Sequence, residues 1–262
     1  MIRRLGAVAL LAVLLTGCQS NFNLATKQLD YTMTSTDKEV AMGRQLAHRV
    51  VAERPLLADD AVQQRVMGIG RRLAAVCGRQ ELVYSFAVLD DDEVNAFSLP
   101  GGYVYVNSGL VKRAADDDEL AAVIAHEVGH IAARHAVKRY EGHLSSLAAQ
   151  LAAVATRQPA AIHGLSTTLA ATRLAYARQD ELEADRLGVQ YLKAAGFNPV
   201  GMLTFLQRLE QLHSDAPSHY LPAGMVRPQY ALTHPFIPER LRAVKEALYD
   251  VADYLDYLNT AP

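Results

Sequence analysis

The chain has 262 residues, of which 50% are hydrophobic and 21% are charged, and its formal net charge at pH 7 is -2. This length and composition predict one globular domain with a sizeable core, and the small negative charge excludes the basic surface that nucleic-acid binding requires. The two cysteines, Cys18 and Cys77, exclude a disulfide framework.

The amino terminus has the pattern of an export signal. Arg3 and Arg4 precede an uncharged run from Leu5 to Gly17, which is too short to span a bilayer as a stable helix. The sequence LTGC that ends at Cys18 resembles the bacterial lipobox, which implies a signal peptide at residues 1–17 and a lipid on Cys18. Similarity to known sorting rules favours the outer membrane, because no Asp follows Cys18. An ordinary signal peptide with an incidental cysteine is the alternative.

Residues 18–35 are polar and weakly patterned, and we expect a tether there. Thr36 or Asp37 is expected to cap a helix that runs to Glu53. A second helix is predicted over residues 59–77, with Gly78 just after its end. Cys77 lies among apolar residues of this helix, and we interpret it as a buried core thiol.

A strand-like block follows, with β-forming residues at 82–89, 95–99 and 103–107 and a Pro-Gly-Gly turn between the last two. A small sheet with an open edge can pair with an extended peptide, although such strands can equally well serve only to fill the core. For the first alternative, the expected substrate strand consists of Tyr103, Val104, Tyr105, Val106 and Asn107.

The next helix carries the most informative motif in the chain, His-Glu-x-x-His at residues 126–130. Asp116 and Glu119 have the spacing of a capping box at its start. His126 and His130 project from one face about a turn apart, where both can bind one metal ion. Apolar flanks predict that the helix is buried, which is costly for these side chains unless they are paired or bind a metal. Glu127 is then placed to act as a general base.

A catalytic zinc site needs a third protein ligand, and the best candidate lies in an acidic helical segment. Glu181 and Asp185 are four residues apart and share a face, whereas Glu183 points elsewhere. We assign Glu181 to the metal and Asp185 to the ring N–H of a ligand histidine. The alternative is an acidic surface that pairs with Arg178 and Arg186.

The remaining segments fit one compact domain over residues 36–262. Residues 140–176 are rich in small residues, and the sequence leaves open whether they form packed helices or a mobile lid. Gly196 is expected to end the helix of Glu181, and a further helix is predicted at 200–213. Residues 214–238 have the composition of a loop, and a last helix is predicted at 239–258.

Several motifs in order resemble one known family. They are the His-Glu-x-x-His motif with Glu181 and Asp185, the segments Asn95-Ala96-Phe97 and Pro100-Gly101-Gly102, and Thr233-His234-Pro235 with Arg240. Together these residues, spread over about 37–250, resemble the HtpX and BepA type of zinc metallopeptidases, which also includes the CAAX prenyl endopeptidases.

The resemblance implies a gluzincin-like α+β fold, mostly helical, with a small sheet whose edge strand flanks the active site. It implies that Glu181 is the third ligand and that His234 and Arg240 face the metal, where they steady an oxyanion. In BepA-like members this histidine can instead occupy the open zinc position. Two departures are expected: no membrane span after the signal, unlike HtpX, and no carboxy-terminal repeat domain, unlike BepA, which weakens the case for outer-membrane assembly partners.

The sequence therefore predicts a zinc-dependent endopeptidase that cleaves misfolded or unfolded proteins in the periplasm, with one Zn²⁺ per chain. The alternative is a chaperone-like lipoprotein that binds outer-membrane proteins and uses zinc mainly for structure. The expected partners are unfolded polypeptides and, through Cys18, a membrane, but not nucleic acid. The sequence does not predict the oligomeric state.

Overall fold

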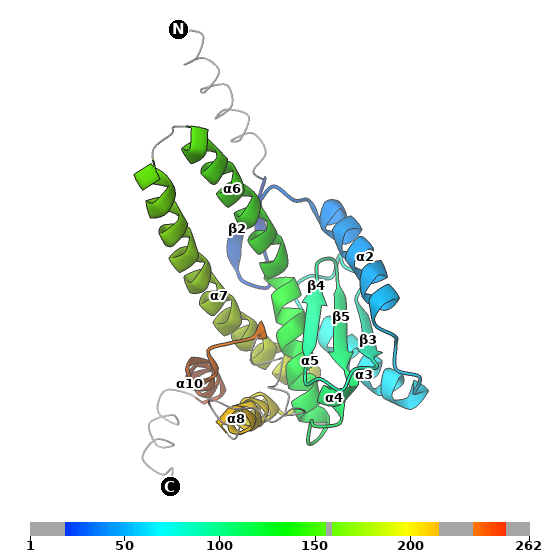
Figure 1. Cartoon of the computed structure of the whole chain (residues 1–262). Helices are drawn as coiled ribbons and strands as arrows, with labels where there is room; N and C mark the ends of the chain where they lie inside the picture. Colours follow the sequence, from blue (N-terminus) through cyan, green and yellow to red (C-terminus); the bar gives the residue numbers. More distant parts are fainter. Residues whose placement is uncertain (1–18, 156–158, 215–232, 250–262) are drawn as a thin grey trace, which may run out of the picture.

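The computed structural model describes residues 19–155, 159–214 and 233–249. In these residues, helices surround one long central helix, and a small sheet covers one side of it (Figure 1). The predicted signal peptide, Cys18, most of the predicted loop at 214–238 and the end of the last predicted helix lie outside the described residues.

Two helices lead into the sheet. Helix α2 spans Thr36–Glu53, and its cap is Ser35, whose hydroxyl accepts from the Lys38 N–H, one residue earlier than predicted. Helix α3 spans Asp60–Ala74 and is capped by Asp59. It ends before Gly78, so the prediction that Gly78 terminates it is wrong.

Gly78 has a packing role instead. A Cβ at this position would lie 2.6 Å from the backbone nitrogen of Ala25, so only glycine allows the amino-terminal segment to approach so closely. Cys77 beside it is buried and free, as predicted, and its sulfur lies 3.2 Å from the Tyr84 hydroxyl.

The three predicted strands are present as β3 (Ser85–Leu89), β4 (Ala96–Leu99) and β5 (Tyr103–Asn107). Strands β4 and β5 form an antiparallel hairpin, whose turn contains Gly101 and Gly102 at φ of 79° and 103°. Strand β3 pairs in parallel with β5. A four-residue helix, α4 (Ser108–Val111), follows β5.

The strand order β3-β5-β4 corrects the expected substrate strand. Strand β5, with Tyr103 to Asn107, lies in the middle of the sheet, and its backbone groups are already paired with β3 on one side and β4 on the other. A peptide cannot add to a central strand, because no free ladder of N–H and C=O groups remains there. The edge strands are β3 and β4, and β4 is the one that contacts the central helix.

Residues expected to form a tether are instead ordered as a second, two-stranded sheet. Strand β1 (Gln19–Asn23) pairs antiparallel with β2 (Gln28–Thr32). The Asn23 side chain accepts from the Ala25 N–H and shapes the turn between the strands. The prediction missed this hairpin because its apolar and polar residues alternate over only a few positions.

The central helix is α5 (Asp117–Ala132), in which every residue from Glu119 onward is buried. Helix α3, helix α8 (Val200–Ser214) and strand β4 pack on it, but its largest interface is with α7 (Pro159–Ala195). Glycines allow the close contact of α5 with α7. A Cβ at Gly129 would lie 2.8 Å from the Ala184 carbonyl oxygen, and one at Gly188 would lie 3.3 Å from the His126 nitrogen.

Two helices complete the described fold. Helix α6 (His135–Ala155) runs beside α7, and α10 (Ile237–Leu248) packs on α7 and α8. Residues 140–176 are thus helical wherever they are described, and the lid stays one of the two alternatives. No described helix has the length and apolarity needed to cross a membrane.

Candidate metal centre

Helix α5 positions the first two candidate ligands. The Asp116 side chain accepts from the Glu119 N–H at 2.9 Å, and Glu119 accepts from the Ala115 N–H at 2.9 Å, which confirms the predicted cap in a slightly shifted form. His126 and His130 follow Glu119 by about two and about three turns. They lie one above the other, with 3.0 Å between their Nε2 atoms. Both side chains are buried.

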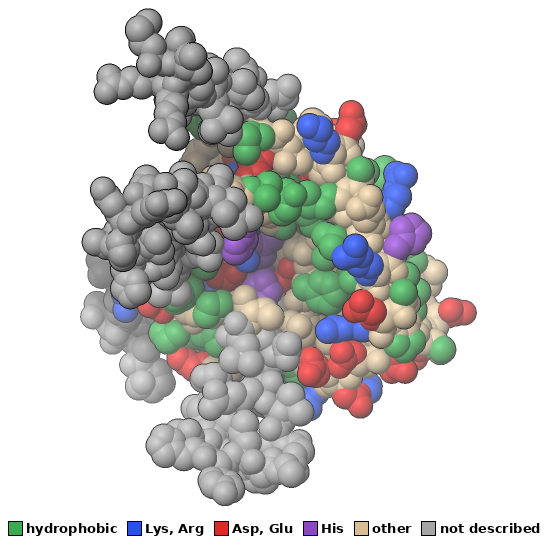
Figure 2. Space-filling model, turned by 45° about the horizontal axis from the view of Figure 1, so that its top comes forward, with side chains coloured by type: hydrophobic (Ala, Val, Ile, Leu, Met, Phe, Trp, Pro, Cys, Tyr) green, Lys and Arg blue, Asp and Glu red, His purple; other side chains and the backbone are tan. Residues whose placement is uncertain are grey.

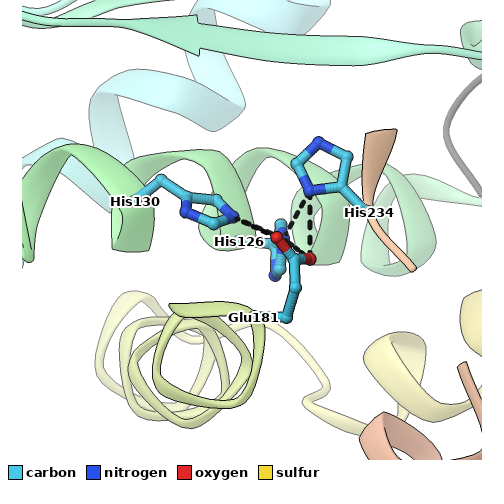
Figure 3. A group of neighbouring side chains, drawn as sticks. All are labelled: His126, His130, Glu181 and His234. Carbon is cyan, nitrogen blue, oxygen red and sulfur yellow. Dashed lines mark hydrogen bonds and ion pairs between the residues drawn. The ribbon is translucent and has the colours of Figure 1, made fainter. Parts of the chain in front are cut away.

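Helix α7 brings the carboxylate of Glu181 to these imidazoles (Figure 3). Its Oε2 lies 3.3 Å from His126 Nε2, and its Oε1 lies 3.4 Å from His130 Nε2. Burial alone would raise the pKa of Glu181, but hydrogen bonds from the histidines hold that pKa far below its usual range, so the group is a carboxylate. The prediction of these three side chains as one cluster agrees with the structure.

His234, in the segment before α10, is the fourth member of the cluster. Its Nδ1 lies 3.2 Å from His126 Nε2 and 3.1 Å from Glu181 Oε2 (Figure 3). Ligand atoms of all four residues lie within 4.8 Å of one another. In the space-filling view, histidine side chains are visible inside a hollow that hydrophobic side chains border (Figure 2). His234 therefore lies where a fourth metal ligand would be.

Asp185 orients His126, as predicted. Its Oδ1 accepts from His126 Nδ1 at 2.7 Å, which leaves Nε2 directed at the cluster. Burial and Arg240 lower the pKa of His126, but Asp185 and Glu181 outweigh them and raise it to about 9. Burial lowers the pKa of His130 well below its usual value. A cation that binds both rings therefore displaces a proton from His126.

Arg240 lies beside the cluster, where the resemblance placed it, and contacts Asp185 and Glu181. It is fully buried, and its Nε and one terminal nitrogen each donate to Asp185 at 2.7 Å. Another terminal nitrogen lies 3.3 Å from Glu181 and donates to the His234 carbonyl oxygen at 3.2 Å. With its donors directed at these groups, Arg240 holds the ligands in position, and its expected role at an oxyanion stays a prediction. Its role depends on contacts between α7 and α10, which the sequence does not reveal.

His135 was missed by the sequence analysis. Its Nδ1 lies 2.8 Å from His130 Nδ1, and its Nε2 lies 3.2 Å from a Glu183 oxygen. Glu183 points away from the cluster, as predicted, but it contacts the residue that orients His130. His135 therefore orients the ring of His130 in the same way as Asp185 orients the ring of His126. The sequence contained a signal, because His135 follows His130, the last ligand of the motif, by only five residues. In the structure, a turn with Arg134 at φ of 61° separates the two.

Glu127 lies on the other side of the cluster, toward the sheet. The Ser98 hydroxyl of β4 donates to its Oε2 at 2.9 Å. Its Oε1 is buried and accepts no hydrogen bond from the described residues, and His234 Nε2 lies 3.3 Å away from it. A buried carboxylate oxygen without a donor is costly, and a water bound beside the cluster would satisfy it.

These side chains fit a zinc ion. Two neutral imidazole nitrogens and one carboxylate are the ligands of a common catalytic zinc site, and both rings are oriented by hydrogen bonds on their far side. Oε1 of Glu127 accepts no hydrogen bond from the described residues, so it provides a partner for a water molecule beside the cluster once the His234 ring moves away. The fold and the site thus define a class of protein, a mostly helical metallopeptidase of the His-Glu-x-x-His type.

Comparison with known proteins identifies the family. Residues 60–248 match the model of peptidase family M48, and the chain belongs to this family. It is 32% identical over 240 residues to the beta-barrel assembly-enhancing protease of Yersinia pestis. The matched region covers 86% of this chain and 48% of that protein. It is 26% identical over 226 residues to metalloprotease YcaL of Escherichia coli K12. This match covers 79% of this chain and 85% of that protein.

A mitochondrial relative also matches: mitochondrial metalloendopeptidase OMA1 of Arabidopsis thaliana is 30% identical over 197 residues, or 74% of this chain and 40% of that protein. The chain thus spans about half the length of the assembly-enhancing protease it matches. These likenesses confirm the resemblance stated from the sequence motifs.

Proposed function

We propose that this protein is a zinc-dependent endopeptidase that cleaves misfolded or unfolded proteins in the periplasm. One observation carries the proposal: a buried carboxylate oxygen of Glu127, without a hydrogen bond from the described residues, lies beside the converging ligand atoms of two histidines and a glutamate. The family and the names of the relatives, which are proteases, support the same function.

The residues around the cluster have separate roles in hydrolysis. His126, His130 and Glu181 would hold zinc, which acidifies a water molecule and polarises the carbonyl group of the scissile peptide. The Ser98 hydroxyl occupies Oε2 of Glu127, so Oε1 is the atom that accepts the proton of the attacking water. Glu127 then transfers this proton to the leaving amine nitrogen.

His234 makes the described arrangement a latent one. Its Nδ1 takes a fourth position in the cluster, and its Nε2 lies 3.3 Å from the Glu127 oxygen that would accept the proton. The His234 ring therefore blocks both the position of the attacking water and the general base, Glu127. A movement of His234 away from Glu181 would open the site, and the same side chain could then approach an oxyanion.

The substrate is expected to bind along β4, Ala96–Leu99. This strand has one side paired with β5, and no described strand pairs with its other side. Ser98 connects β4 to Glu127 directly, so a peptide that extends the sheet at this edge would pass the cluster. Backbone hydrogen bonds would provide most of the binding, which suits unfolded chains of varied sequence.

The proposed location rests on the amino-terminal sequence. The LTGC motif supports a lipid on Cys18, and the lack of an Asp after Cys18 supports attachment to the outer membrane. The substrate would then be a polypeptide of the periplasm that has failed to fold. No observation in the described residues favours the chaperone-like alternative.

A substitution of the base tests the proposal. Glu127→Gln keeps the size of the side chain and removes its basicity, so we expect zinc content and melting temperature to stay unchanged while cleavage of casein falls about 10²- to 10⁴-fold. Glu210→Gln, a change of the same kind at an exposed position of α8, is the control and should retain most activity. Full activity of the Glu127→Gln protein would refute the proposed mechanism, and complementation of a deletion strain by it would favour the chaperone alternative.

A further inference from the structure

The β1–β2 hairpin has its polar and apolar faces reversed. Three polar side chains face the protein and are buried, namely Asn23, Asp30 and Thr32. Three apolar or aromatic ones face outward, namely Phe22, Leu29 and Tyr31, with exposed fractions of 58%, 54% and 67%. A sheet with one face in water normally shows the opposite pattern. Contact with water alone therefore does not explain why the outward face is apolar.

Specific polar contacts fix the hairpin in this orientation. Asn23 donates to the Ala132 carbonyl oxygen at the end of α5 at 2.9 Å, and Asp30 pairs with Lys138 of α6 at 2.8 Å. Arg134 donates to the Thr32 hydroxyl at 2.9 Å. To turn the apolar face inward, all three contacts would have to break, so the outward direction of the apolar face is built into the fold.

The outer face forms one apolar surface. Phe22 and Leu29 are direct partners across the two strands, and Tyr31 follows on the same side. Leu24 at the turn and Met33 after β2 are also exposed. Among the exposed side chains from 22 to 33, the only charged one is that of Lys27, and the single acid of this segment is buried. An apolar, aromatic surface with a positive charge suits the boundary between acyl chains and anionic headgroups.

The position of the hairpin in the chain identifies the membrane as its partner. Strand β1 begins at Gln19, the residue directly after Cys18, which follows the uncharged run of residues 5–17. At about 3.3 Å per strand residue, Phe22 lies within about 13 Å of Cys18 along the chain. A lipid on Cys18 would therefore keep this apolar surface at the bilayer.

We propose that the outer face of the β1–β2 hairpin, with Phe22, Leu24, Leu29, Tyr31 and Met33, inserts into the interface of the bilayer that anchors Cys18. The inference rests on the proposed lipid at Cys18. Asn23 attaches the hairpin to the end of α5, the helix of His126 and His130. The hairpin beside α6 (Figure 1) thus fixes the direction in which the metal site faces relative to the membrane surface.

Fluorescence tests this inference without reference to peptidase activity, because the chain contains no tryptophan. Tyr31→Trp is introduced into the full lipidated chain, which is then reconstituted in vesicles of phosphatidylethanolamine and phosphatidylglycerol. We expect tryptophan emission to shift to shorter wavelength and to fall at least two-fold when dibrominated phosphatidylcholine is included. Val83→Trp, at a position 87% exposed and remote from the hairpin in sequence, is the control and should show neither change.

Vesicle flotation separates the possible failures. If the Tyr31→Trp protein floats with the vesicles but its emission is neither shifted nor quenched, the hairpin inference is wrong and the lipid anchor stands. If the protein does not float, both are wrong, whereas the peptidase proposal is unaffected. A shift without vesicles that grows with protein concentration would indicate a second copy on this face and would also overturn the inference. Replacement of Phe22 and Leu29 by Ser should abolish the quenching of a tryptophan at position 31.

Discussion

His234 is the side chain on which the state of the site depends. It contacts two of the three candidate ligands and also the general base, and it is carried by a segment separate from both ligand helices. A ring held in this way would compete with water for a bound metal, and it would also compete with an attacking water for Glu127. The geometry favours the latent alternative over a purely oxyanion-stabilising role in the described state.

Removal of this ring should therefore increase basal activity. If His234 blocks the cluster in about 90% of molecules, His234→Ala raises the competent fraction about ten-fold, and casein cleavage should rise to a similar extent. The measurement is the initial rate with purified, zinc-loaded protein. The double substitution with Glu127→Gln should be inactive, which excludes a contaminating protease. A fall in the rate would mean that the ring acts mainly on the oxyanion.

His135 and Glu183 provide a second residue-scale prediction. Because His135 orients the ring of His130, His135→Ala should weaken zinc binding about 10- to 100-fold, as measured by competition with a chelator. His143→Ala, an exposed position on the same helix, is the control and should bind zinc normally. Both metal-free variants should still unfold in one cooperative thermal transition, which separates a positioning role from loss of the fold. Unchanged zinc affinity of His135→Ala would contradict this role.

At the scale of elements, the start of α5 determines where the ligand helix begins. Glu119 is buried, accepts from the Ala115 N–H, and forms two contacts of 3.1 Å with Arg208 of α8. Burial raises the pKa of Glu119, but the hydrogen bonds from Arg208 and Ala115 outweigh it, and the pKa lies below its usual 4.5. The ionised side chain thus stabilises the contact between α5 and α8.

The sign of the pH dependence follows from this lowered pKa. The stabilisation by Glu119 is fully present above about pH 4.5 and is lost as the pH falls through the pKa of the folded state. We expect Glu119→Gln to lower the free energy of unfolding by about 1–3 kcal/mol at pH 7 and by much less at pH 3, as measured by urea denaturation. Glu210→Gln, an exposed glutamate on α8, should have little effect at either pH. An equal loss at both pH values would contradict the electrostatic explanation.

At the scale of the whole molecule, the metal connects parts of the chain that are far apart. The four residues of the cluster come from α5, α7 and the segment before α10, which span positions 126 to 234. Without a cation, buried polar groups of these elements face one another at distances near 3 Å. A bound cation therefore stabilises the packing of the helices as well as the site.

Removal of zinc should consequently lower thermal stability. At a free zinc concentration a thousand times the Kd, binding stabilises the folded state by about 4 kcal/mol, which corresponds to about 8–16 °C in melting temperature for a chain of this size. Differential scanning calorimetry before and after chelation measures the shift, and added zinc should reverse it. Glu181→Gln should show a much smaller shift. An unchanged melting temperature after proven metal loss would contradict the proposed site.

The parts of the fold that local patterns encode were predicted well. Helix α2, helix α8 and the three strands of the larger sheet lie close to their predicted ranges, because caps, turn glycines and hydrophobic periodicity act over a few residues. The two histidines of α5 and the pair Glu181 and Asp185 on α7 were identified for the same reason. A spacing of four residues on a helix fixes a shared face without any knowledge of the fold.

The order of strands, the contacts of Arg240 and His135, and the docked hairpin were decided by the tertiary structure alone. Strand β5 could be placed between β3 and β4 only from its pairing on both sides, which joins residues far apart in the chain. Arg240 reaches Asp185 across 55 residues, and His135 meets Glu183 across 48. The sequence by itself determined which side chains can bind a metal, since that depends on local helical geometry. Which groups orient them, block them or receive a peptide depends on packing between distant elements, and no short pattern encodes it.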